Sequence, residues 1–226
     1  MPRSREAKDA LFDAFAGVAK AMASGRRAEI IDLLAQGERS VEDIATEIDQ
    51  SVANTSHHLR LLARSGLLRS RRSGTHVLYR LTSPRVAELW TALRDVAATH
   101  VAEVGVLATD LVGDRTDVEA LRPDELARRI EAGSVVVLDA RPQSEYESGH
   151  IAGARSVPID ELPDAVAGLP GSREIVAYCR GPYCVKADDA VRILHDHGLR
   201  ARRLDTGYPE WRHAGLPVEA PDPSTA

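Results

Sequence analysis

The spacing of apolar residues predicts a series of helices in the first quarter of the chain. Apolar side chains recur at helical spacing over residues 5–23, and a second helical pattern runs from there to Gly37. Two shorter patterns follow, Ser40–Ile48 and Ser51–Gly66, each opening on a serine that can cap the first turn. A short helix, a tight turn and a second helix form the helix-turn-helix arrangement, so the pattern predicts this motif.

Alternating residues then predict a β-hairpin, and a long helical seam follows it. Residues 67–72 and 77–81 alternate as strands around Gly74, which suits the turn, and this hairpin is called the wing below. From Pro84 to Leu111 apolar residues recur at a period near 3.5, which predicts one long helix. Such a seam has little of its own chain to pack against, so we expect it to pair with a second copy in a homodimer.

The second half of the chain alternates buried strands with helices. Strands are predicted at 135–139, 175–178 and 201–204, and helices at 123–132, 185–197 and 208–214. This order is typical of a parallel α/β sheet. The predicted domains are therefore a mainly α winged helix-turn-helix domain (1–111), a polar linker (112–117), an α/β domain (118–220) and a tail (221–226).

Charge distribution adds a candidate partner. The net charge is −5, yet no acidic residue lies between Asp49 and Glu88, where the basic residues are Arg60, Arg64, Arg69, Arg71, Arg72, Arg80 and Arg85. A local cationic surface in an acidic protein is the electrostatic pattern expected of nucleic-acid contact.

No apolar run is long enough to cross a bilayer and the start is not secretory, so we expect a cytoplasmic protein with no membrane partner. Two cysteines exclude a disulfide framework.

The segment from Ser51 to Leu62, with Ser65–Leu68 and Arg71–Gly74, resembles the recognition helix and wing of the ArsR family of winged-helix regulators. The resemblance spans roughly residues 5–111 and implies a repressor that binds a double-stranded DNA operator. Small polar residues let a helix enter the major groove, and basic residues reach bases or phosphates. The candidate DNA contacts are Ser51, Asn54, Thr55, Ser56, His57, His58, Arg60, Arg71, Arg72 and His76. An alternative for the two histidines is that one packs in the core.

Metal sensing, which many members of that family perform, has little support in the residues. The predicted helix 41–48 contains no cysteine, and the seam offers only Asp95, His100 and Glu103. We therefore expect neither a metal site nor a cofactor.

The second half carries three ordered motifs that resemble a rhodanese domain over about residues 118–218. They are Val137–Pro142 with Glu145–Ala154, then Tyr178–Val185, then Leu204–Trp211. The resemblance implies a sulfurtransferase fold whose nucleophile is Cys179, taking sulfur from a small sulfane-sulfur donor such as thiosulfate or a persulfide.

Cys179 follows an apolar strand and precedes a loop that leads into a helix. The loop amides and the helix N-terminus can stabilise a thiolate, so we expect Cys179 to be acidic and nucleophilic. The other loop candidates are Arg180, which can attract an anionic donor or remain solvated, with Gly181, Pro182, Tyr183 and Val185. A phosphatase on a similar sheet needs an arginine where Val185 stands, which disfavours that reaction.

Two further residues keep two interpretations each. Cys184 lies at the far end of the loop, where it can resolve a persulfide or simply pack as a small side chain. Arg141 either lines the substrate pocket or has a structural role.

The leading hypothesis joins the halves in a repressor whose DNA affinity depends on the sulfur state of Cys179. The rival is a housekeeping sulfurtransferase that uses the winged helix only for dimerisation.

Overall fold

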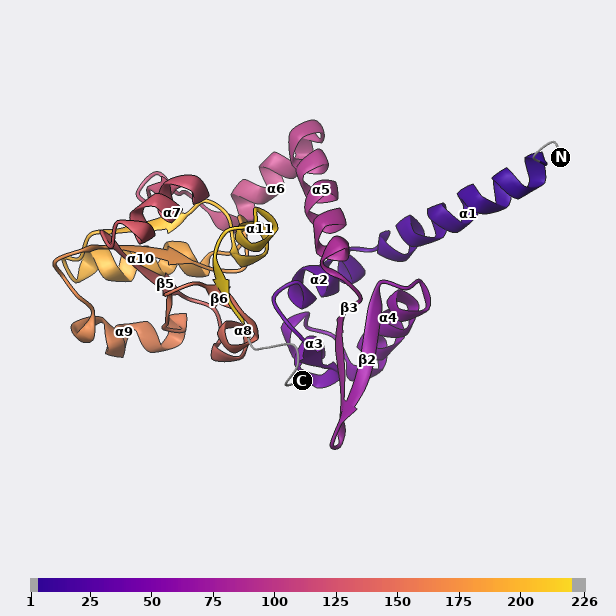
Figure 1. The fold of residues 1–226 in the computed structure, drawn as a ribbon, viewed down its shortest axis with the longest axis horizontal. Coiled ribbons are helices and arrows are strands. Elements are labelled where there is room, and N and C mark those ends of the chain that lie inside the picture. Colours follow the sequence, from indigo (N-terminus) through magenta and orange to yellow (C-terminus); the bar gives the residue numbers. More distant parts are fainter. Residues whose placement is uncertain (1–3, 221–226) are drawn as a thin grey trace. The chain divides into compact units, whose positions relative to one another are not determined.

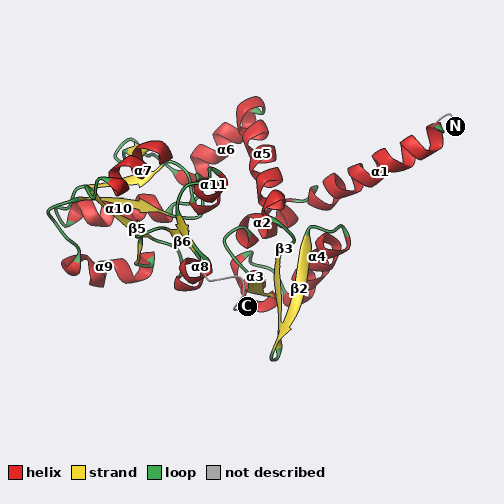
Figure 2. Cartoon of the chain, viewed as in Figure 1, coloured by secondary structure: helices red, strands yellow, loops and turns green. Residues whose placement is uncertain are grey.

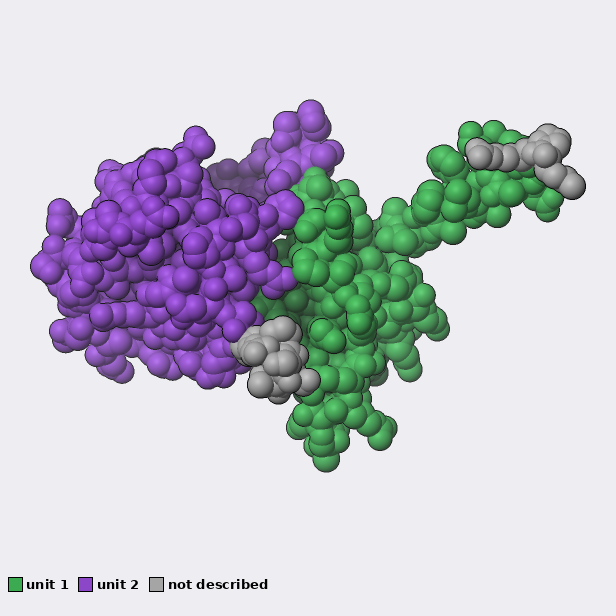
Figure 3. Space-filling view, viewed as in Figure 1, with its two compact units in different colours: residues 1–93 green, residues 94–226 purple. Residues whose placement is uncertain are grey.

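The computed structural model describes residues 4–220 and divides the chain into two compact units, Met1–Leu93 and Arg94–Ala226 (Figures 1 and 3). Each unit contains buried hydrophobic clusters of its own. The predicted tail, residues 221–226, lies outside the described residues.

The first unit begins with four helices: α1 (Arg5–Met22), α2 (Gly25–Leu34), α3 (Val41–Glu47) and α4 (Val52–Arg64). The side chains of Ser40 and Ser51 accept hydrogen bonds from backbone N–H groups in the first turns of α3 and α4, at 3.0 and 3.2 Å. Ile30, Ile44 and Leu59 are fully buried where α2, α3 and α4 meet. The predicted helix-turn-helix is therefore present.

A small antiparallel sheet completes this unit (Figure 2). Its strands are β1 (Arg39–Ser40), β2 (Leu68–Ser73) and β3 (His76–Leu81), in the order β1-β3-β2. Gly74 has a φ of 61°, a left-handed value that glycine adopts without steric cost in the tight turn of the wing. Tyr79 packs the inner face of the wing against the helical core.

The predicted seam helix is two helices, so the prediction of one continuous helix is wrong. α5 spans Pro84–His100 and α6 spans Ala102–Val112. Between them Val101 has an extended backbone, φ −110° and ψ 100°, and acts as the N-cap of α6. Val101 is β-branched, which disfavours helix, and the apolar period continues across it, so the period did not reveal the break. Many apolar side chains of the two helices stay exposed, including Leu89, Leu93, Val96, Val106, Leu107 and Leu111.

The second unit is built on a five-stranded parallel sheet in the order β4-β9-β8-β5-β7. The strands are β4 (Ala120–Leu121), β5 (Val135–Asp139), β7 (Arg155–Ser156), β8 (Glu174–Tyr178) and β9 (Ala201–Leu204). A separate two-stranded sheet pairs β6 (His150–Ile151) with β10 (Val218–Glu219). The helices are α7 (Pro123–Glu131), α8 (Gln143–Ser148), α9 (Leu162–Ala165), α10 (Lys186–Asp196) and α11 (Tyr208–His213), with 3₁₀ turns at Ile159–Glu161 and Val166–Gly168.

Alternation along the central strands gives the five-stranded sheet two hydrophobic faces. Val136 and Leu138 of β5 belong to a cluster with residues of α9 and α10. Val135 and Val137 belong to a second cluster with residues of α7 and α11. Successive side chains of a strand point to opposite faces, so these helices cover the two sides of the sheet. β8 lies in the middle, and the residue after it therefore emerges from the interior of the fold.

Candidate active site and DNA-reading surface

Cys179 directly follows the central strand β8, at the carboxyl end of the parallel sheet. The side-chain sulfur is enclosed by the loop that leads to α10, and Cys179 is only 2% exposed. Its Sγ lies 3.4 Å from the carbonyl oxygen of Cys184 and 3.9 Å from that of Gly181, so the thiol can donate to these oxygens. In this geometry the loop binds the protonated thiol.

The two cysteines of this loop differ in acidity. Burial raises the pKa of Cys179 well above its usual value, and the neighbouring Cys184 adds to the effect, although the N–H groups of Gly181 and Ala187 oppose it. For Cys184 a hydrogen bond from Cys179 lowers the pKa to about 6, against the effect of burial. The sequence predicted that Cys179 would be the acidic thiol. The two sulfurs interact and titrate as a pair, so the identity of the thiolate stays a prediction.

Arg180 is held by a buried carboxylate. Its Nη2 lies 2.6 Å from Oε1 of Glu145, and its Nε donates to the same oxygen at 2.8 Å. Glu145 is 1% exposed, and it belongs to α8 in the first rhodanese-like motif. An arginine in this ion pair is less available to a solvent anion than a solvated one, and its catalytic role stays a prediction.

The remaining candidate residues of the cysteine loop are partly shielded from solvent. Gly181, Pro182, Tyr183 and Val185 are all half-buried. Gly207 packs so closely against the loop that a Cβ there would stand 2.4 Å from the carbonyl carbon of Arg180 and the nitrogen of Gly181. The sequence motif included Gly207 without a reason for it, and this close approach supplies one.

Arg141 is fully buried and bound to the protein. Its guanidinium donates to both carboxylate oxygens of Asp139, with Nη2 to Oδ2 at 2.6 Å, and to the carbonyl oxygen of Gly149 at 2.8 Å. Burial opposes its charge, but the hydrogen bonds and charge of Asp139 outweigh this and raise its pKa. The guanidinium also lies 4.5 Å from the ring centroid of Tyr208. These contacts favour the structural interpretation, and a role in the substrate pocket stays a prediction.

The predicted DNA-reading residues of α4 are not all on its exposed face. Ser51, Asn54, His57 and Arg60 are exposed, and Ser56 is half-buried. Thr55 is fully buried, so as a base contact it is a wrong prediction. Its position is one helical turn from the buried Leu59, which places it on the core face of the same helix.

His58 is intermediate between the two interpretations. It is half-buried, and burial followed by the charge of Arg27 lowers its pKa, which favours the neutral ring. Its ring lies 6.0 Å from that of His57 in an edge-on arrangement. One histidine of the pair thus packs partly into the unit and the other faces solvent.

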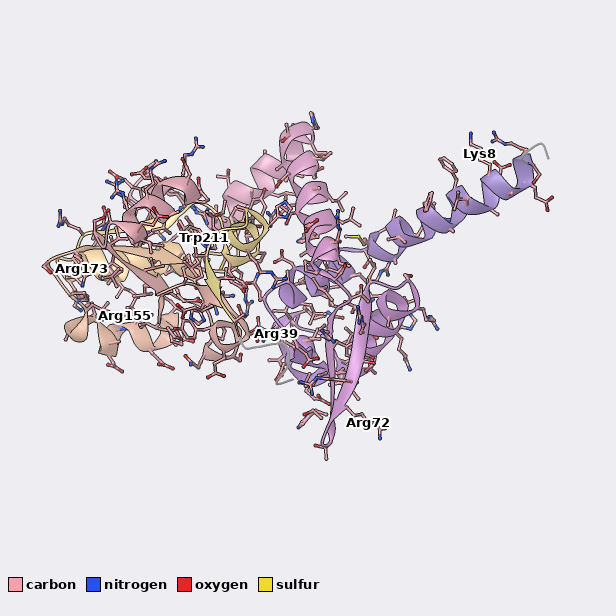
Figure 4. All side chains as sticks on the ribbon, in the orientation of Figure 1. Lys8, Arg39, Arg72, Arg155, Arg173 and Trp211 are labelled. Carbon is pink, nitrogen blue, oxygen red and sulfur yellow. The ribbon has the colours of Figure 1, made fainter. Side chains whose placement is uncertain are left out.

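The wing presents basic side chains with different surroundings. Arg72 is exposed near the tip of the wing, where Figure 4 labels it. Arg71 forms a bidentate ion pair with Glu38, with Nε to Oε2 at 2.9 Å and Nη2 to Oε2 at 2.5 Å. The third wing candidate, His76, lies with Nδ1 3.5 Å from a carboxylate oxygen of Glu42. The charge run in the sequence predicted the exposed arginines but not these acidic neighbours.

The described residues contain neither a metal-binding cluster nor a membrane-spanning helix. Within residues 4–220, no cluster of three or more His, Cys, Asp or Glu side chains is arranged to hold a metal ion. No helix in the same part of the chain has the length and apolar character needed to span a membrane.

Comparison with known proteins assigns a family to each half. Residues 24–70 match the bacterial regulatory protein arsR family, and residues 122–214 match the rhodanese-like domain. The HTH-type transcriptional regulator Rv0324 of Mycobacterium tuberculosis is 50% identical over 97% of this chain and 96% of its own length. The thiosulfate sulfurtransferase GlpE of Stutzerimonas stutzeri is 28% identical over 43% of this chain and 88% of its own length.

A solved structure resembles the first half. It is the homodimeric winged helix-turn-helix DNA-binding domain Mb0332 of Mycobacterium bovis, 43% identical over 46% of this chain and 95% of that chain, with a TM-score of 0.42. Together, the full-length relative and the two family matches cover the helix-turn-helix and the cysteine loop described above. The chain belongs to the ArsR family of DNA-binding transcription regulators and carries a C-terminal rhodanese-like domain.

Proposed function

We propose that this regulator is a homodimeric repressor whose binding to an operator depends on a persulfide formed at Cys179. The observation that carries the proposal is the complete cysteine loop at the carboxyl end of β8, with backbone N–H groups directed at both sulfurs. The first unit contains no cysteine, so the thiols that can react with a sulfur donor both lie in the second unit. The relatedness of this half to a named thiosulfate sulfurtransferase supports the same chemistry.

The proposed sulfur transfer has two balanced steps. The Cys179 thiolate attacks the outer sulfur of thiosulfate, the sulfur–sulfur bond of the donor breaks, and sulfite leaves with the bonding electron pair. Cys179 then carries a persulfide anion. A nucleophilic acceptor such as cyanide or a thiolate attacks the terminal sulfur, removes it, and regenerates the Cys179 thiolate.

Cys184 has a defined part in this scheme. The single proton of the Cys179 thiol can turn from the loop carbonyls to the Cys184 sulfur, and this hydrogen bond lowers the pKa of Cys184 to about 6. The same contact lets Cys184 receive the proton of Cys179 as the donor approaches. Cys184 can also attack the inner sulfur of the persulfide; the persulfide bond breaks, the proton held by Cys184 passes to the leaving sulfur, and hydrosulfide departs as a disulfide forms with Cys179, which is the resolving role.

The dimer is proposed from an apolar face that the chain itself leaves uncovered. α1 projects from the rest of its unit, and Leu11, Phe12 and Phe15 on it are 51%, 59% and 61% exposed (Figure 1). A second copy that buries these side chains removes a large apolar surface from water. Two-fold symmetry then implies an operator with two inverted half-sites about one helical turn apart. Light scattering at micromolar concentration tests the dimer, and a monomer there would contradict it.

The regulatory proposal is tested by titrating operator DNA with the intact protein before and after treatment with a sulfane-sulfur donor. We expect the donor to weaken binding by about 5- to 150-fold, the usual range of a coupling free energy of about 1 to 3 kcal/mol. The Cys179→Ser variant should bind the operator and not respond. A full response in this variant would place the sensor elsewhere.

A sulfite-release assay with thiosulfate separates the regulator from the rival housekeeping enzyme. Cys179→Ser should release none, while Cys184→Ser should retain the first step at a reduced rate, because the Cys179 sulfur is still present but loses the neighbouring group that receives its proton. Sulfur transfer together with an absence of specific DNA binding would favour the housekeeping sulfurtransferase.

A further inference from the structure

Arg115, which no sequence motif contained, binds the cysteine loop from the segment between α6 and β4. Its Nη1 donates to the carbonyl oxygen of Pro182 at 2.8 Å, and its Nη2 donates to the carbonyl oxygen of Cys184 at 3.3 Å. The same Nη2 donates to Oδ2 of Asp188 at 2.6 Å. One guanidinium therefore joins two carbonyls of the loop to the first turn of α10.

The Cys184 carbonyl oxygen is shared between Arg115 and the reacting cysteine. The Sγ of Cys179 lies 3.4 Å from this oxygen, and Arg115 donates to it from another direction. When Cys179 becomes a persulfide anion, the thiol donor to this oxygen disappears and the Arg115 donor remains. Arg115 therefore contacts the reacting sulfur indirectly, through the carbonyl oxygen of Cys184 that both groups approach.

Asp188 fixes the position of the guanidinium. Its side chain is 1% exposed, and it pairs with Arg115 on one oxygen and with Arg203 of β9 on the other, at 3.2 Å. A buried carboxylate requires charged partners, so this contact is costly to break. The loop carbonyls are therefore held against the sheet and α10 through one rigid donor.

Arg192 provides an internal comparison because it binds the same segment, and its hydrogen bonds go to Asp114, Asp117 and Asp189. Its Nε donates to Oδ2 of Asp117 at 2.9 Å, and its Nη2 donates to the carbonyl oxygen of Asp114 at 2.8 Å. Arg192 and Arg115 therefore both tie residues 114–117 to α10. The contacts to the Pro182 and Cys184 carbonyls are made by Arg115.

We infer that Arg115 is a positioning residue for Cys179, which holds the cysteine loop in the geometry needed for persulfide formation. The inference rests on the proposed sulfur transfer and adds to it a residue outside the family motifs. It also makes residues 114–117 a support of the sulfur site, where the sequence suggested only a polar linker.

The test compares Arg115→Ala, Arg115→Lys and Arg192→Ala in the full-length protein. Sulfite released in a single turnover with thiosulfate measures persulfide formation, and hydrogen exchange measures how firmly the backbone N–H groups within residues 181–187, all except Pro182, are held. We expect Arg115→Ala to slow sulfite release about tenfold, through a lower rate at saturating donor, and to speed loop exchange. Arg115→Lys should recover part of the rate, since an ammonium can replace one of the three contacts. Arg192→Ala should stay within about twofold of the wild type in both measurements.

Each outcome decides one point. Equal losses in Arg115→Ala and Arg192→Ala would assign the effect to anchoring of the segment, and an unchanged Arg115→Ala would also overturn the inference. If the wild type releases no sulfite, the proposed sulfur transfer fails, and hydrogen exchange still decides the positioning role. Faster exchange of residues 181–187 in Arg115→Ala but not in Arg192→Ala supports that role, and equal exchange refutes it.

Discussion

Arginine is used in opposite ways in the two units. Around α4 and the wing, Arg60 and Arg72 point into solvent, where a phosphate backbone can reach them. In the second unit, Arg141 and Arg180 have side-chain exposures of 0% and 17% and form ion pairs with carboxylates beneath the surface. A solvated arginine is available to a partner, whereas a buried one stabilises the fold that surrounds it. The environment, and not the residue type, separates a binding role from a structural one.

The strongest test of this contrast is Arg141→Ala. Removing the guanidinium leaves the buried Asp139 carboxylate without its main charged partner, and breaking a buried pair in this way costs about 3 to 5 kcal/mol. Urea unfolding of the second unit can be followed by Trp211 fluorescence in a Trp90→Phe background. The exposed Arg155 supplies the control, and Arg155→Ala should change stability by less than about 0.5 kcal/mol. Similar values for the two variants would remove the distinction.

A second test uses the cysteines, whose acidity also depends on burial. With the pKa of Cys184 at about 6, the wild type should carry about one thiolate per chain at pH 7, measured by ultraviolet absorbance. Cys179→Ala removes the hydrogen bond that lowers this pKa, which then rises toward about 8.5, so the thiolate at pH 7 falls about 30-fold. The titration midpoint therefore moves to higher pH.

The matched variant for the cysteine test is Cys184→Ala, which leaves Cys179 alone in the loop. Burial still raises the pKa of Cys179 in this variant, although the loss of Cys184 removes part of the rise, so the variant should carry far less thiolate at pH 7 than the wild type. As much thiolate as in the wild type would instead favour the expectation from sequence that the loop amides make Cys179 the acidic thiol.

The smallest effects are expected on the wing. Arg72→Ala should weaken binding to every DNA sequence by about three- to tenfold and reduce the salt slope by about one, because one phosphate contact is lost. Arg71→Ala should have a smaller effect, since Glu38 already neutralises part of its charge. Binding isotherms at several salt concentrations distinguish the two, and a larger effect of Arg71→Ala would reverse the assignment.

Local patterns predicted much of this fold. Helical and alternating periods predicted the winged helix-turn-helix and the three central strands of the second unit. Each of these elements buries one or both of its faces, and burial leaves a regular pattern of apolar residues in the sequence. The two-residue strands β4, β6 and β7 are too short to produce a period. The break at Val101 was missed because the apolar period continues on either side of it.

For the site, motifs predicted the positions but not the partners. The sequence motifs identified Cys179 and its loop. They did not identify the pair of Arg115 and Asp188, because these residues are 73 positions apart in the sequence and only the fold brings them into contact. The burial of Thr55 and the lowered pKa of Cys184 likewise depend on the residues that surround each side chain in the fold. Contacts between distant segments leave no trace in the spacing of one sequence.

The ion pair between Glu38 and Arg71 has a consequence for how the wing searches DNA. The Glu38 carboxylate occupies the face of the guanidinium that a phosphate would take, so it acts as a tethered counterion. DNA must displace this internal anion at each encounter, and the anion can return as soon as the DNA leaves. We expect that exchange to shorten contacts with unrelated sequence while costing little at an operator, where the other contacts hold the wing in place.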